Sequence, residues 1–74
     1  MKFIRVKMYV DSHYITENLF FCGEQFPDHV KALERFHRFH PSASAPNVNC
    51  VAETVDIDTE SDYFKACMRC GAVV

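Results

Sequence analysis

The sequence predicts a small α+β domain in which a four-stranded antiparallel sheet carries one helix on one of its faces, in the order ββαββ. Three observations indicate this fold class. Apolar and polar residues alternate over four segments, as they do in half-buried strands. A single segment between the second and third of these has the periodicity of an amphipathic helix. The chain has 74 residues, 49% of them hydrophobic, which suits a single domain with a small core.

The four strands are expected at about residues 2–10, 14–22, 49–58 and 63–72. In the first strand, every second side chain is apolar: Ile4, Val6, Met8 and Val10. In the fourth, the same alternation places four residues on one side: Phe64, Ala66, Met68 and Cys70. The first two strands are expected to form a hairpin whose turn is Ser12 and His13. In that register Ile4 faces Phe21 on the apolar side of the hairpin.

The helix is expected at about residues 27–40. Pro27 suits the first helical turn, where its missing N–H would have no partner, and Asp28 opposes the positive end of the helix dipole. Pro41 biases the residue before it away from helical geometry and so ends the helix. Steps of about 100° per residue gather the apolar side chains on one arc: Val30, Ala32, Leu33, Phe36 and Phe39. This arc should cover the sheet.

The predicted sheet leaves one face open, and basic and aromatic residues gather on that face: Phe3, Arg5, Lys7, Tyr9, Phe20, Tyr63, Lys65 and Arg69. Aromatic and arginine side chains supply most of the binding energy of protein interfaces. Basic residues among aromatics also suit single-stranded nucleic acid, through phosphate contacts and base stacking. The alternative interpretation is an ordinary solvated sheet face. The formal net charge of −2 argues against a general nucleic-acid coat protein but permits a local basic patch.

A second candidate site would hold zinc. Cys67 and Cys70 form a CxxC motif followed by glycine, as in zinc knuckles. Two further pairs could complete a tetrahedral set of ligands: His37 with His40, or Cys22 with Cys50. A regular strand directs Cys67 and Cys70 to opposite faces, so a metal requires the strand to end near Cys67. The favoured interpretation is that no cofactor is bound, that the cysteines are semi-buried and that the histidines rim the core.

No catalytic signature is present, since the chain has no Gly-rich phosphate loop, no HExxH motif and no EF-hand loop. The start of the chain is interrupted by Lys2, Arg5 and Lys7, so no signal peptide is expected. No stretch approaches the roughly 18 apolar residues that a bilayer span needs. We therefore expect a cytoplasmic protein that has no membrane partner and is not an enzyme.

In its length, in its initial strand and in its ββαββ order, the chain resembles the very small single-domain proteins of phages and mobile elements, several anti-CRISPR proteins among them. The resemblance lies in plan alone, and no residue role is carried over from it. It implies an inhibitor that works in the host cytosol.

The sequence thus predicts a non-catalytic binding module that docks on a larger protein or nucleoprotein machine through the basic and aromatic face and blocks or modulates it. Two alternatives stay open, namely a zinc-stabilised nucleic-acid-binding domain and a structural homodimer. A monomer and a homodimer are both compatible with the pattern.

Overall fold

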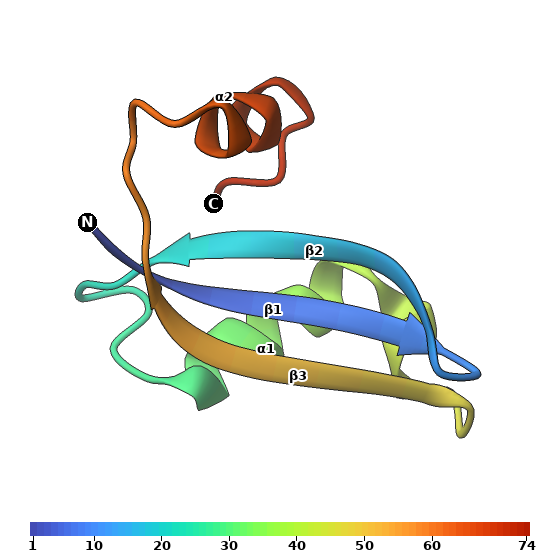
Figure 1. Ribbon diagram of the computed structural model, residues 1–74. Coiled ribbons are helices and arrows are strands. Elements are labelled where there is room, and N and C mark those ends of the chain that lie inside the picture. Colours follow the sequence, from blue (N-terminus) through green and yellow to red (C-terminus); the bar gives the residue numbers. More distant parts are fainter.

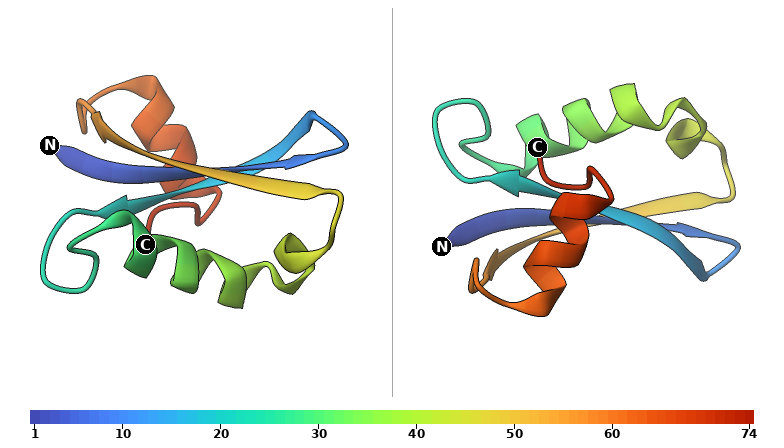
Figure 2. Two further views of the ribbon diagram at one scale, coloured as in Figure 1. Left: turned by 90° about the horizontal axis from the view of Figure 1, so that it is seen from below. Right: turned by 90° about the horizontal axis from the view of Figure 1, so that it is seen from above.

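The computed structural model describes residues 1–74 and contains three strands and two α-helices (Figure 1). In chain order the elements are β1 (Lys2–Val10), β2 (His13–Phe21), α1 (His29–Phe39), a short 3-10 helix η1 (Pro41–Ser44), β3 (Val48–Asp56) and α2 (Asp62–Arg69). The strands form one antiparallel sheet in the order β2-β1-β3. The two helices pack on opposite faces of this sheet (Figure 2). No helix is both long enough and apolar enough to cross a membrane.

The predicted fold class was wrong in its last element, because the segment expected as a fourth strand at about residues 63–72 is helix α2. The hydroxyl of Ser61 caps this helix by accepting a hydrogen bond from the Phe64 N–H at 3.2 Å. Gly71, with a φ of 72°, ends it, and the Ala72 N–H returns to the Cys67 carbonyl at 2.9 Å. The two residues that face the sheet, Phe64 and Cys67, are one helical turn apart, so the period is helical.

The remaining elements begin and end within two residues of the expected ranges, but the register of the first hairpin was wrong by one residue. Its turn is Asp11 and Ser12, whose φ angles of 50° and 68° are those of a type I′ turn. Ile4 therefore pairs with Phe20 and not with Phe21. A register shift between Met8 and Tyr9 leaves Ile15 without a partner, which is a β-bulge in β2.

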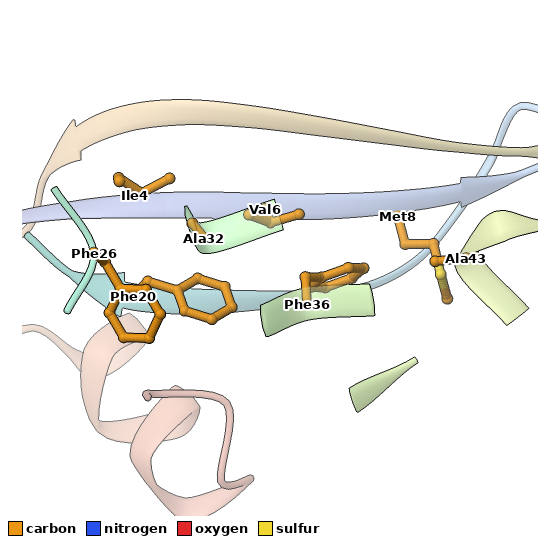
Figure 3. Close-up of a cluster of buried hydrophobic side chains, with 8 residues drawn as sticks. All are labelled: Ile4, Val6, Met8, Phe20, Phe26, Ala32, Phe36 and Ala43. Atoms are coloured by element: carbon orange, nitrogen blue, oxygen red, sulfur yellow. The ribbon is translucent and has the colours of Figure 1, made fainter. Parts of the chain in front are cut away.

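Two apolar clusters fill the space between the sheet and its helices. The larger lies under α1 and is shown in Figure 3: Ile4, Val6, Met8, Phe20, Phe26, Ala32, Phe36 and Ala43. The smaller lies under α2: Phe3, Leu19, Ile57 and Cys67. The central strand β1 contributes side chains to both clusters, so it is buried on both faces where α2 lies.

The C-terminal residues extend the sheet at its β2 edge. The Leu19 N–H donates to the Ala72 carbonyl and the Val74 N–H donates to the Leu19 carbonyl, both at 2.8 Å. The buried Asn18 supports this contact, because its amide nitrogen donates to the Ala72 carbonyl at 3.2 Å. Its amide oxygen lies 3.0 Å from Nε2 of His40, so one side chain joins β2, the end of α1 and the C-terminal tail.

The turn geometry predicts that replacing Ser12 by glycine stabilises the protein. Glycine adopts the positive φ of this position without steric strain, and Asp-Gly is a preferred type I′ sequence. We expect the free energy of unfolding to rise by about 0.5 kcal/mol in urea denaturation followed by circular dichroism. Ser12→Ala is the control, since it removes the hydroxyl and keeps the Cβ. An equal gain in both variants would show that the hydroxyl, and not the backbone angle, decides the effect.

The end of α2 predicts the opposite response at Gly71. Its positive φ strains any residue with a Cβ, although no atom lies within 4 Å of that Cβ position. Gly71→Ala should therefore lower the free energy of unfolding by about 1 kcal/mol. At Gly23 a Cβ would make only ordinary contact, at 3.5 Å from the Phe21 ring, so Gly23→Ala serves as the matched control. A loss of stability at Gly23 as large as that at Gly71 would contradict this explanation.

Candidate functional site

All three tyrosines of the chain lie on the sheet face that α2 covers only in part. Helix α2 lies over the end of the sheet where β1 begins, and the same face is open toward the β1–β2 turn (Figure 1, Figure 2). The side chains that meet on this face, called the tyrosine face below, are Arg5, Lys7, Tyr9, Tyr14, Glu17, Val51, Glu53 and Tyr63.

Because of the β-bulge, both even-numbered and odd-numbered residues of β2 point to this face. Before the bulge Tyr14 pairs with Tyr9, and after it Glu17 pairs with Lys7, so Tyr14 and Glu17 share one side of the sheet. The rings of Tyr9 and Tyr14 meet edge to face, with centroids 6.1 Å apart. A regular strand would have placed Tyr14 on the α1 side.

Glu17 holds two of the three phenols. The Tyr14 hydroxyl donates to Oε1 of Glu17 at 2.8 Å, and the Tyr63 hydroxyl donates to Oε2. This carboxylate thereby ties helix α2 to strand β2. Burial, followed by the hydrogen bond to Glu17, raises the pKa of Tyr14 to about 12 and also raises that of Tyr63. Both phenols are therefore neutral hydrogen-bond donors at physiological pH.

A second carboxylate, Glu53, contacts both basic residues of the face. Arg5 contacts its Oε1 through Nη2 at 2.7 Å and Nε at 2.9 Å, and Nζ of Lys7 lies 3.7 Å from the same oxygen. The hydrogen bond from Arg5 lowers the pKa of Glu53. Glu17 pairs with Lys7 in the β1–β2 register, so two positive and two negative side chains stand together on this face.

The structure divides the predicted binding residues among three places. Four of them lie on the tyrosine face: Arg5, Lys7, Tyr9 and Tyr63. Phe3 is buried under α2 and Phe20 under α1. Lys65 and Arg69 are exposed on α2 and belong to no sheet. The fourth strand that was expected to carry Lys65 and Arg69 is helix α2, so these two residues are not held in the sheet beside Arg5 and Lys7.

An apolar hollow of about 270 Å³ adjoins the tyrosine face, between β2 and α2. Most of its lining is hydrophobic: Tyr14, Ile15, Thr16, Glu17, Tyr63, Ala66, Cys67, Cys70 and Ala72. Its volume is smaller than the roughly 300–1,000 Å³ of small-molecule sites, so it is better sized for one side chain of a partner. The sequence analysis did not predict Ile15 or Glu17 as site residues. Two signals could have shown that residues 62–69 form a helix next to them, namely Ser61 as its N-terminal cap and Gly71 at its C-terminal end.

The residues proposed as zinc ligands do not converge. Nδ1 of His37 lies 2.8 Å from the Leu33 carbonyl, while Nε2 of His40 is taken by Asn18. Cys67 is buried in the cluster under α2 and Cys70 is exposed. His40 and Cys70 line one hollow, and His37 lines a different one. No group of three or more histidine, cysteine or acidic side chains is placed to hold a metal ion.

The alternative zinc ligands lie apart from the CxxC motif. Cys22 and Cys50 pack against the cluster under α1, on the other face of the sheet from Cys67. All four cysteines are free thiols, and burial raises the pKa of the Cys50 thiol.

Comparison with known proteins found no protein family that matches this chain, and no similar curated protein or solved structure.

The bridge at Glu17 predicts how the tyrosines titrate. Glu17→Gln removes the negative charge that both phenols face, so the pKa of Tyr14 and that of Tyr63 should fall. Neither should reach the ordinary tyrosine value, because burial, the larger cause, remains. Alkaline titration followed by tyrosinate absorbance, with ring signals resolved by NMR, measures both groups. Glu53→Gln is the control, since Glu53 bonds to neither phenol; equal shifts in both variants would contradict the bridge.

Proposed function

We propose that this protein is a non-catalytic binding module that docks on a partner protein through the tyrosine face. The observation that supports this most is the gathering of three tyrosines on one face, where Tyr14, 53% exposed, and Tyr63, 39% exposed, line an apolar hollow and Tyr9 packs on Tyr14. Tyrosine is among the residues that dominate binding energy at protein interfaces, because it offers a large contact area and a polar tip. The hollow supplies a place for an apolar anchor from the partner.

The tyrosines are held before any partner arrives. Glu17 fixes the hydroxyls of Tyr14 and Tyr63, and the ring of Tyr9 packs on that of Tyr14. Ordering an interface side chain on binding costs about 0.5–1.5 kcal/mol, and this cost is reduced where the ring is already fixed. A fixed set of aromatic rings therefore favours a docking surface over an ordinary solvated sheet.

The charges of the face support a protein partner over nucleic acid. Arg5 and Lys7 already contact Glu53, and Glu17 lies among them. Phosphate binding relies on unpaired cations, whose number sets the salt dependence of affinity. The same contacts engage both carboxylates of the face, Glu17 and Glu53, so neither is free to act as a general base, which supports a non-catalytic role.

The size of the molecule favours a larger partner. A standard interface takes about 800 Å² from each side, which is about a sixth of the 4790 Å² surface of this chain. The molecule itself measures only 36 × 26 × 17 Å. Blocking of a larger protein or nucleoprotein machine, as in phage-type inhibitors, is the form of the proposal that the sequence resemblance favours.

The proposal predicts that Tyr14→Ala combined with Tyr63→Ala abolishes partner capture. Wild-type protein immobilised as bait identifies proteins that it retains from a lysate of its source cells, and calorimetry with the purified partner measures affinity. Loss of two anchors should cost about 2 kcal/mol or more, which is about a thirtyfold weaker complex. Met68→Ala is the matched control, because Met68 is exposed on the same helix but does not line the hollow. Unchanged affinity in the tyrosine variant, or an equal loss in the control, would refute the assignment.

A second experiment tests the alternative that the protein binds nucleic acid directly. Fluorescence anisotropy with a labelled single-stranded oligothymidylate tests direct binding at physiological salt, and we expect none. Binding that weakens in Arg5→Ala and as salt rises would move the function to nucleic acid.

A further inference from the structure

The two edges of the sheet differ in how they are protected. At the β2 edge, a bulge interrupts the strand at Ile15, and the C-terminal tail occupies the N–H and carbonyl of Leu19. The β3 edge has no such device. Its nine residues, Val48–Asp56, run in unbroken register with β1 and include no proline, lysine or arginine (Figure 1). Bulges, prolines and lysines are the usual means by which proteins stop an edge strand from pairing with another chain.

The free edge presents a row of backbone groups. Cys22 donates to the carbonyl of Lys2, whereas Asp11 donates to that of Asn47, so the even residues of β1 bond to β2 and the odd residues bond to β3. In antiparallel strands the direction alternates with each residue. The N–H and carbonyl groups of β3 that point outward therefore belong to Cys50, Ala52 and Thr54, and no hydrogen bond outside the ladder uses them.

Apolar side chains flank this row on both faces of the sheet. On the tyrosine face Val51 is 43% exposed. On the other face, one side of α1 is turned toward β3, because Nε2 of His29 lies 2.9 Å from Oγ1 of Thr54. That side carries Val30, which is 62% exposed, and Leu33. These two line an open hollow of about 530 Å³ together with Glu34, His37 and Arg38.

We propose that the β3 edge is an interface for a second copy of this chain, in which two β3 strands pair antiparallel about a two-fold axis at Val51. The product is a continuous six-stranded sheet. It has two α1 helices on one face and two tyrosine faces side by side on the other. This proposal does not depend on the function of the tyrosine face.

The strand sequence is self-complementary in this register. Val51 meets Val51 of the second copy, and Glu53 meets Asn49, whose amide can donate to the carboxylate. The outward groups of Cys50 pair with those of Ala52, so the hydrogen-bond alternation also matches. A two-fold axis at Glu53 would instead place carboxylate against carboxylate. In an isologous dimer the same patch of both subunits meets across the two-fold axis, so the patch has to be complementary to itself.

The same two-fold axis brings the α1 helices together. They run antiparallel on one face, and the side of each helix that carries Val30 and Leu33 turns toward the other. Burial of these side chains removes apolar surface from water on the face where the single chain leaves it exposed. Backbone pairing and apolar burial then act at one interface.

The inference predicts a dimer that is weakened when the same charge is introduced at residue 51 of both chains. Sedimentation equilibrium of the reduced wild-type protein, from about 1 μM to about 1 mM, should show the mass rise from one chain to two. Val51→Lys and Val51→Glu should each raise the dissociation constant by about tenfold or more, because like charges then meet across the axis. An equimolar mixture of the two variants should restore the dimer, since residue 51 of one chain faces residue 51 of the other.

Ile15→Lys is the matched control, because it places the same charge at an exposed β-branched residue of the opposite edge. It should leave the dissociation constant unchanged, and circular dichroism should show all four proteins folded. A monomer throughout the concentration range overturns the inference. A dimer that Val51→Lys leaves intact, or a mixture that stays monomeric, overturns the register at Val51.

Discussion

The structure depends on covering the central strand β1 on both of its faces. Ile4, Val6 and Met8 point toward α1, while Phe3 points toward α2, and all four are buried. A three-stranded sheet with a helix on one face alone would leave Phe3 and its neighbour Leu19 in water. Helix α2 therefore has to return across the sheet, and the carboxylate of Glu17 holds it there through Tyr63.

Much of the fold follows from local pattern, and the part that does not depends on caps and contacts. Strand β1 alternates without interruption, and α1 has both a start and a stop in its sequence, so both could be predicted. In residues 62–69 the apolar positions satisfy a period of two as well as a helical period. Only the cap at Ser61 and the positive φ at Gly71 distinguish the two, and these signals are weaker than hydrophobic alternation.

The candidate site was predictable where it rests on β1. Arg5, Lys7 and Tyr9 share a face because a regular strand alternates, and the sequence analysis placed them together for that reason. Tyr14 and Glu17 join them only through the bulge, which inverts the parity of β2 partway along the strand. Tyr63 reached the same face by a different route, as a helical residue and not as part of a strand. Sequence alternation has no means of locating a bulge or of finding a helix that crosses the sheet.

The pairing of β1 with β3 has a consequence for the order in which the protein folds. Lys2 pairs with Asp56 across most of the chain, whereas the β1–β2 hairpin joins neighbours through a two-residue turn. Contacts between distant residues carry the larger entropic barrier, so the hairpin should form first and then wait for the second half of the chain. Until β3 and α2 pack on it, the hairpin leaves apolar side chains of both its faces in water, and exposed apolar surface of this kind promotes aggregation.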